Sequence, residues 1–132
     1  MLKEISILTS SRVEFVDITE RVSAVIKETK VENGFCVLFV PHTTAGITIN
    51  ENADPSVISD ISKKLNKLIP EDENYSHSEG NSDAHIKSTL VGNSLYLIIE
   101  NKRLKLGTWQ GVYFCEFDGP RHRKIWMKIV PG

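Results

Sequence analysis

The hydrophobic and polar positions of this 132-residue chain repeat with two different periods, which predict two kinds of element. The opening LKEISIL alternates apolar and polar residues and predicts a strand over residues 2–8, because successive strand side chains point to opposite faces. FCVLFV is a continuous apolar run rich in β formers, which predicts a central strand ending at Pro41. GITIN and SLYLIIE predict two more strands, over residues 46–50 and 94–100.

Apolar residues spaced three and four apart predict the helices. Thr19 is expected to cap a first helix that ends near Asn33 and Gly34, and whose apolar side holds Val22, Val25 and Ile26. A second helix is expected to start at Asp54 and Pro55, since a carboxylate accepts the free amide protons and proline fits the first helical position. Pro70 should end that helix, whose apolar face consists of Val57, Ile58, Ile61, Leu65 and Leu68.

The second half of the chain adds a polar loop, a short helix and two β segments. Residues 71–82, EDENYSHSEGNS, are too polar to pack as regular structure, and such a loop in a compact domain is usually functional or disordered. Asp83 is expected to cap a short helix that Gly92 finishes in a left-handed conformation. WQGVYFCEF and RKIWMKIV predict two strands joined by a hairpin-like turn at DGPRH. The pattern is that of an α+β fold with a largely antiparallel sheet.

Composition narrows the class of protein. A chain of 132 residues with 40% hydrophobic and 25% charged residues fits one globular domain, 1–132. Sixteen basic against seventeen acidic residues give a net charge of −1, so we expect no nucleic-acid partner. The start lacks a secretory apolar stretch and no run could cross a bilayer, so we expect a cytoplasmic protein without a membrane partner. Cys36 and Cys115 lie in apolar runs and are expected to be buried thiols.

Three of the four histidines occupy polar segments that could form a metal site. His42 follows the central strand, while His77 and His85 flank Asp83 within nine residues, on a loop that enters a helix. Imidazole is the commonest protein ligand of transition metals, and three nitrogen ligands with one open position suit a catalytic zinc ion whose bound water ionises near neutral pH. The spacing matches no strict zinc signature, so three solvated or hydrogen-bonded loop histidines are an equal alternative.

Other polar residues near the histidines could handle protons or hold a substrate. Glu51 follows an apolar strand, where partial burial would raise its pKa, and it is the candidate general acid or base together with Asp83. Asp54 is better explained as a helix cap. Hydroxyl and ammonium groups of Thr43, Thr44, Ser82 and Lys87 could bind a phosphate or carboxylate of a small metabolite. Asn50 and Gln110 join Thr43 and Lys87 as substrate-binding candidates only through the resemblance given below. Ordinary loop residues and a solvated lysine are the simpler alternative.

Two further features have mainly structural explanations. The basic tract at residues 121–124 is expected at the surface, with His122 outside the metal set, and Trp109 is expected to pack in a core or interface. Gln110 and Glu116 fall on one face of an apolar strand, so they need polar partners, which a neighbouring subunit could supply.

Three strings in this order, HTTAGITINENADP, EGNSDAHIKSTLVGNSL and LGTWQGVYFCEFDGPRHR, resemble the YjbQ-type family, small proteins often described as secondary thiamine-phosphate synthases. The resemblance spans nearly the whole chain. It implies a β-sandwich-like sheet with two to three helices, and a homotrimer with polar pockets between subunits. The family's site pattern falls on His42, Thr43, Asn50, Glu51, Asp54, His77, Asp83, His85, Lys87, Trp109 and Gln110.

The resemblance and the residues together support three hypotheses. The first is an enzyme, a transferase or hydrolase, that uses a divalent metal, zinc, at His42, His77 and His85 to act on a small phosphorylated metabolite. The family activity joins a pyrimidine diphosphate to a thiazole phosphate, although the chain lacks a Gly-rich phosphate loop and an aspartate-rich magnesium motif, which suggests a side activity. The second hypothesis is a non-catalytic anion-binding trimeric module. The third is a polar cluster that only fixes the geometry of a trimer.

Overall fold

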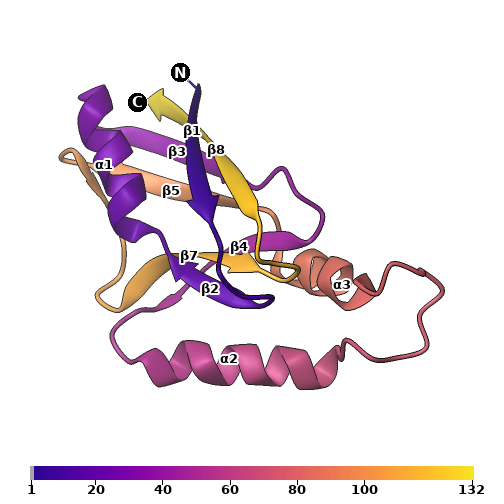
Figure 1. Ribbon diagram of the computed structural model, residues 1–132. Helices are drawn as coiled ribbons and strands as arrows, with labels where there is room; N and C mark the ends of the chain where they lie inside the picture. Colours follow the sequence, from indigo (N-terminus) through magenta and orange to yellow (C-terminus); the bar gives the residue numbers. More distant parts are fainter. Residues whose placement is uncertain (1) are drawn as a thin grey trace.

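The computed structural model describes residues 2–132, in which eight strands form two antiparallel sheets accompanied by three helices (Figure 1). The five-stranded sheet has the order β1-β8-β3-β5-β6 and the three-stranded sheet the order β2-β7-β4. The strands are β1 (Leu2–Leu8), β2 (Glu14–Asp17), β3 (Gly34–Phe39), β4 (Ala45–Glu51), β5 (Ser94–Glu100), β6 (Arg103–Leu104), β7 (Gln110–Glu116) and β8 (His122–Pro131). The helices are α1 (Thr19–Thr29), α2 (Pro55–Leu68) and α3 (Ser82–Val91). The α+β class with antiparallel sheets is confirmed.

The five-stranded sheet pairs the first strand of the chain with the last, β1 with β8. β8 lies between β1 and β3, with Leu2 opposite Lys128 and Leu8 opposite His122. β3 has β8 on one side and β5 on the other, so the prediction of a central strand in FCVLFV is confirmed.

The predicted hairpin between the last two strands is wrong. β7 pairs with β2 and β4, whereas β8 pairs with β1 and β3, so the intervening DGPRH segment carries the chain from one sheet to the other. Its turn residues, which include a cis peptide bond before Pro120, fit this sheet-to-sheet crossing as well as they would fit a hairpin. Local turn chemistry alone therefore does not identify the strand's partner.

The main hydrophobic core lies between the two sheets and α1. Alternate residues of β3, β8, β4 and β7 point into it, and α1 contributes Val22 and Ile26 with neighbouring Ile18. A smaller cluster of Ala84, Cys115 and Phe117 lies on the other face of the three-stranded sheet, under α3. Both cysteine thiols are buried and free, as predicted.

The ends of the helices agree only in part with the sequence. Asp54 caps α2 as predicted, its Oδ1 accepting the Ser56 amide at 2.9 Å with Pro55 in the first turn. Thr19 is wrong as the cap of α1: it is already helical, and the Asp17 carboxylate accepts its amide at 3.0 Å. α1 also ends at Thr29, before Asn33, with Lys30 in a left-handed conformation.

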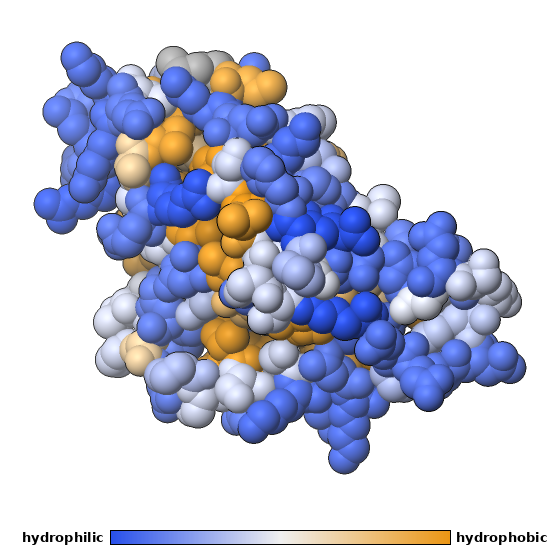
Figure 2. Space-filling model, in the orientation of Figure 1, coloured by the Kyte–Doolittle hydropathy of each residue, from blue (hydrophilic) through white to orange (hydrophobic). Residues whose placement is uncertain are grey.

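The apolar face of α2 is covered less completely than its pattern predicts. No residue of α2 is buried in the described structure, and Leu68 remains 62% exposed. α2 runs along the lower edge of the molecule, and hydrophobic surface is visible in the middle of this face and between the sheets and α2 (Figures 1 and 2). Within residues 2–132, no helix has the length and apolar character needed to span a membrane.

Candidate functional site

The candidate site begins where α3 is fastened to the first residues of β4. The Ser88 hydroxyl donates to the Ala45 carbonyl at 2.7 Å, and the Ile47 amide donates to the Gly92 carbonyl at 3.0 Å. A Cβ on Gly46 would lie 2.7 Å from that same carbonyl oxygen, so only glycine permits so close an approach. These contacts place His85, one turn earlier on α3, beside the loop that precedes β4.

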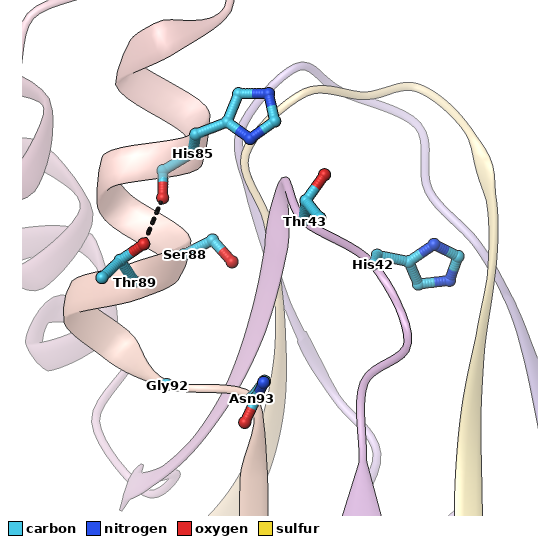
Figure 3. Close-up of a pocket in the computed structure, with 7 residues that line it drawn as sticks. All are labelled: His42, Thr43, His85, Ser88, Thr89, Gly92 and Asn93. Atoms are coloured by element: carbon cyan, nitrogen blue, oxygen red, sulfur yellow. Dashed lines mark hydrogen bonds between the residues drawn. The ribbon is translucent and has the colours of Figure 1, made fainter.

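A cavity of about 450 Å³ lies between α3 and this loop (Figure 3). Every lining residue except Gly92 has a polar side chain, and they include the predicted metal ligands His42 and His85 and the predicted substrate-binding Thr43. The other lining residues are Ser88, Thr89, Gly92 and Asn93. The His85 side chain extends from α3 toward the loop, whereas the His42 ring points away from His85 toward β8 (Figure 3). The cavity has the size of a small-metabolite site.

His42 is held in a particular protonation state by its surroundings. Its Nε2 atom accepts the backbone amide of Lys124 at 3.0 Å, so in the neutral ring the proton is on Nδ1. Burial and the nearby Arg123 guanidinium lower the pKa of His42 below 6.5, which keeps the ring neutral at pH 7. In this orientation His42 has no free nitrogen lone pair for a metal ion.

His77 and His85 are the two predicted ligands that the structure brings together. Their ring centroids are 5.5 Å apart with the planes at 80°, and both line a second hollow of about 310 Å³ with Tyr75. Two imidazoles that bind one tetrahedral ion have centroids about 5 Å apart, given metal–nitrogen distances of about 2.1 Å. The centroid spacing of the pair is thus close to that of two ligands of one ion, but residues 2–132 contain no group of three histidine, cysteine or carboxylate side chains around a common point.

Asp83 does not cap α3. The first helical residue follows Asn81, and the fully buried Asp83 carboxylate binds Lys87 Nζ at 3.1 Å and Arg12 Nη2 at 2.9 Å. Lys87, only 2% exposed, also donates to Asn66 Oδ1 at 2.7 Å. This cluster borders a separate cavity of about 410 Å³ on the α2 side of the molecule. Asp83 and Lys87 are thus close to each other but do not line the His42–His85 cavity.

Glu51, Asn50 and Gln110 gather at the opposite end of β4. Glu51 is opposite Gln110 in the sheet, and its Oε2 atom accepts the Asp54 amide at 3.2 Å. Glu51 is six residue steps beyond Ala45 on β4, which corresponds to about 20 Å along a strand. Glu51 therefore cannot reach the histidine cavity of its own chain.

Trp109 does not pack in the core of its own chain, because its side chain is 63% exposed in the turn before β7, and its packing in an interface stays a prediction. The Gln110 side chain folds over the same turn, where its Oε1 atom accepts a hydrogen bond from the Gly107 amide at 2.8 Å. The Asn52 amide binds the Trp109 carbonyl at 2.9 Å, so Trp109 belongs to the same end of the molecule as Glu51.

The buried partner of Glu116 comes from the same chain, which corrects the expectation of a neighbouring subunit. Arg123 Nε lies 2.9 Å from Glu116 Oε1, and the Thr9 hydroxyl donates to the same oxygen at 2.7 Å. The sequence already indicated that Arg123 faces the core. Arg123, Ile125 and Met127 are two residues apart on one strand and therefore share a face. The basic tract is therefore not uniformly superficial, since Arg123 is 4% exposed.

The predicted site residues thus form three groups within one chain: the histidine cavity, the buried Asp83–Lys87 cluster and the Glu51–Trp109 end. The first offers imidazole and hydroxyl groups around an open cavity, and the last offers a half-buried carboxylate beside an exposed indole. Proton transfer by Glu51 at that cavity requires a second chain.

Comparison with known proteins places the chain among relatives of similar length. The family model described as UPF0047 protein YjbQ-like matches residues 3–132. A UPF0047 protein of Methanocaldococcus jannaschii is 57% identical over 98% of this chain and 94% of its own, and the UPF0047 protein YugU of Bacillus subtilis is 52% identical over 98% and 99%. The crystal structure of a YjbQ/UPF0047 family protein from Clostridium acetobutylicum superposes with a TM-score of 0.94 at 56% identity, covering 97% of this chain and 99% of that one. A YbjQ-like protein of unknown function from Sulfolobus solfataricus reaches the same TM-score at 30% identity, covering 100% and 97%. The chain therefore belongs to the UPF0047 (YjbQ-like) family.

Proposed function

We propose that this protein is a metal-dependent enzyme that acts on a small phosphorylated metabolite. We also propose that it works as a homotrimer in which each active site contains residues of two chains. The observation that carries the proposal is the polar cavity of about 450 Å³ at His85, next to the His77–His85 pair whose spacing suits one ion. The reaction suggested by the family resemblance is the transfer that joins a pyrimidine diphosphate to a thiazole phosphate.

The metal, zinc in our proposal, is held by His77 and His85. A bound divalent ion supplies Lewis acidity and a water of lowered pKa. His42 joins the set only if its ring turns away from the Lys124 amide, because that hydrogen bond occupies Nε2. Otherwise His42 only lines the cavity as an uncharged side chain, and Thr43 and Thr89 offer hydroxyl groups to the substrate.

Glu51 is assigned the proton transfer. Asp83 is unsuited to that role because it is fully buried between Arg12 and Lys87, whereas Glu51 is half-buried near a surface that a second chain can reach. The two halves of the site lie at opposite ends of β4. A closed ring, in which one end of each copy meets the other end of the next, brings unlike surfaces together at every interface.

An exposed apolar face supports assembly. Phe35, Phe39, Tyr96, Ile98 and Trp126 lie on the outer side of the five-stranded sheet, and each is at least 37% exposed. Strand register puts Phe35 opposite Ile98 and Phe39 opposite Trp126, so they form one continuous patch. Exposed apolar patches of this kind mark interaction sites on soluble proteins. We propose that another copy of the chain covers this patch.

Metal analysis of the purified protein tests the first part of the proposal. Wild-type protein is expected to retain close to one zinc ion per chain, and His77→Ala and His85→Ala are each expected to lose it. His122→Ala is the matched control, because His122 lines neither histidine cavity. Full zinc content in both His77→Ala and His85→Ala would remove the basis of the mechanism.

Mixing two inactive variants tests whether the site is shared. His85→Ala and Glu51→Gln chains, co-expressed in equal amounts, should regenerate about a quarter of the wild-type sites if a ring assembles at random from both. The measurement is turnover of the pyrimidine diphosphate and thiazole phosphate. If both groups acted from the same chain, every chain of the mixture would stay inactive.

The alternative function is a trimeric module that binds a metabolite anion without changing it. It is favoured by the open cavity at His85, whose hydroxyl and imidazole groups suit an anion without a contribution from Glu51. Calorimetry separates the two functions, because stable binding of both phosphorylated compounds without product supports the module. A purely structural role gains if chelation leaves the mass and melting temperature unchanged while histidine substitutions dissociate the assembly.

A further inference from the structure

The basic tract at the start of β8 forms a hollow that the proposed function has not used. Strand alternation turns His122 and Lys124 outward and Arg123 inward. The hollow has a volume of about 260 Å³ and is lined by Glu4, Ser6, His42, His122, Arg123 and Lys124. His42 lines both this hollow and the His85 cavity.

Arg123 is a fixed hydrogen-bond donor at the floor of this hollow. Its Nε and Nη2 atoms bind Glu116, and Nη2 also donates to the Thr44 hydroxyl at 2.8 Å. These bonds leave Nη1 without a protein acceptor among the described residues, yet Nη1 is not one of the buried polar atoms that lack a partner. Because Arg123 lines the hollow, Nη1 is the guanidinium nitrogen left for a ligand there, although the residue is only 4% exposed. A guanidinium held on two sides needs no reordering to bind a ligand.

The rim of the hollow is suited to an anion with a hydrogen-bond donor attached. Lys124 and His122 are exposed and line the hollow, and the Lys124 ammonium lies over the Trp126 ring, 5.9 Å from its centroid. The flexible lysine stem lets this ammonium swing to an anion at the rim. Glu4 is the opposing charge, and its Oε2 atom already accepts the Trp126 indole N–H at 3.0 Å. The remaining acceptor capacity of Glu4 suits a hydroxyl or ammonium group of the ligand, since a carboxylate accepts several hydrogen bonds.

We propose that this hollow is an oxyanion site, which holds the phosphate or carboxylate of a small hydroxylated or amino metabolite on Arg123, Lys124 and His122. This inference names the groups that hold the anion of the substrate. It rests on the proposed function for the reaction that the bound substrate undergoes. Lys87, the lysine expected from the sequence to bind phosphate, is engaged by Asp83 and Asn66 at a different cavity. A ligand anchored on Arg123 extends past His42 into the His85 cavity.

Amide chemical shifts during titration with inorganic phosphate test the proposal on the intact protein. Residues 122–124 and His42 are expected to shift along one saturating curve. Lys124→Glu is expected to weaken phosphate binding at least about tenfold, because it removes a charge-assisted hydrogen bond and adds repulsion. Lys64→Glu, the same charge reversal on the exposed side of α2, is the matched control and should bind phosphate like wild type. His122→Ala is a second variant that leaves the buried Arg123–Glu116 pair intact.

Titration of His85→Ala separates this proposal from the metal site. Phosphate binding that persists in His85→Ala, even if that variant has lost its metal, supports a separate oxyanion site. Binding that disappears in His85→Ala but survives in Lys124→Glu overturns the inference, as does an absence of saturable shifts at residues 122–124. Competition with acetate distinguishes the two kinds of anion. Displacement of phosphate by an equal concentration of acetate indicates that the natural ligand binds through a carboxylate, and a lack of displacement indicates that it binds through a phosphate.

Discussion

Arg123 and Glu116 form a buried ion pair between the two sheets, with Arg123 Nε 2.9 Å from Glu116 Oε1. Burial alone would raise the pKa of Glu116, but hydrogen bonds from Arg123, Thr9 and the Asp118 amide, together with the charge of Arg123, hold this pKa below 4.5. A carboxyl group whose pKa is lower in the folded than in the unfolded chain stabilises the fold at pH values above its unfolded-state pKa. This stabilisation is lost as the pH falls through the folded-state pKa. The melting temperature should therefore fall as the pH drops below about 4.5.

Glu116→Gln tests this link between the ion pair and acid stability. The variant leaves Arg123 buried without its counterion, so we expect a loss of about 3–5 kcal/mol in the free energy of unfolding at pH 7. Its stability should also change less than that of wild type between pH 5 and pH 3 in urea titrations. Glu28→Gln, on the exposed side of α1, is the control and should keep the wild-type dependence. An unchanged acid dependence in Glu116→Gln would contradict the assignment.

Lys87→Met is expected to destabilise the fold through Asp83. The substitution removes the ammonium at 3.1 Å and leaves the buried Asp83 carboxylate with Arg12 as its remaining cation. Loss of one partner of such a pair costs about 3–5 kcal/mol, which urea unfolding monitored by circular dichroism will measure. Lys64→Met on the surface of α2 should change stability by less than about 0.5 kcal/mol. Equal effects of the two substitutions would show that the cluster adds little to stability.

The two cysteines should be inert in the folded protein. Burial raises the pKa of Cys36 to about 11 and also raises the pKa of Cys115, so neither forms appreciable thiolate at pH 8. A thiol-specific chromogenic reagent should label neither cysteine in native buffer and both in 6 M guanidinium. Rapid labelling of either under native conditions would show that the core opens readily around it.

Gly46→Ala should disturb the histidine cavity from a distance. Its new Cβ would lie 2.7 Å from the Gly92 carbonyl oxygen, which is backbone and cannot rotate away. We expect a loss of about 1–3 kcal/mol in unfolding free energy, typical of overpacking, together with shifted amide resonances for His85 and Ser88. Thr48→Ala, on the same strand face, removes atoms and should leave those resonances in place. Unperturbed α3 resonances in Gly46→Ala would show that α3 is not held by this contact.

Tyr96→Glu tests the proposed contact between copies. Tyr96 is 78% exposed on the outer face of the five-stranded sheet, so its replacement should leave the single chain folded but place a charge in the apolar patch. Light scattering after size-exclusion chromatography should give a trimer mass for wild type and a smaller mass for the variant. Leu68→Glu places the same charge on α2, where Leu68 is 62% exposed, and should keep the wild-type mass. A wild-type monomer, or a trimer unaffected by Tyr96→Glu, would contradict the proposed interface.

Sequence periodicity predicted the elements well because burial of one face determines most of them. β1 alternates and β3 is continuously apolar, and both lie where those patterns place them, in a sheet with one face on the core. β2 was missed because its four residues, EFVD, are too few to show a period. The partner of β8 could not be predicted, since the turn residues at DGPRH suit both a hairpin and a crossing between sheets.

The candidate site was predicted less well, since residues close in sequence diverge in space. Asp83, His85 and Lys87 lie within five residues on one helix, yet α3 turns His85 toward β4 and buries Asp83 and Lys87 on the α2 side. The spacing of Asp83 and Lys87 already indicated a mutual salt bridge, since side chains four apart on a helix are neighbours. Arg12 was not considered because 71 residues separate it from Asp83.

The position of β8 between β1 and β3 also has a consequence for synthesis. β1 is synthesised well before β8, its strand partner within the described chain, which follows more than 110 residues later. During synthesis β1 therefore stays with both rows of its backbone groups unpaired until β8 has been made. Pairing between such distant segments slows folding, and an exposed edge strand invites association with other chains. Nascent chains of this protein are thus expected to need protection from chaperones until β8 emerges.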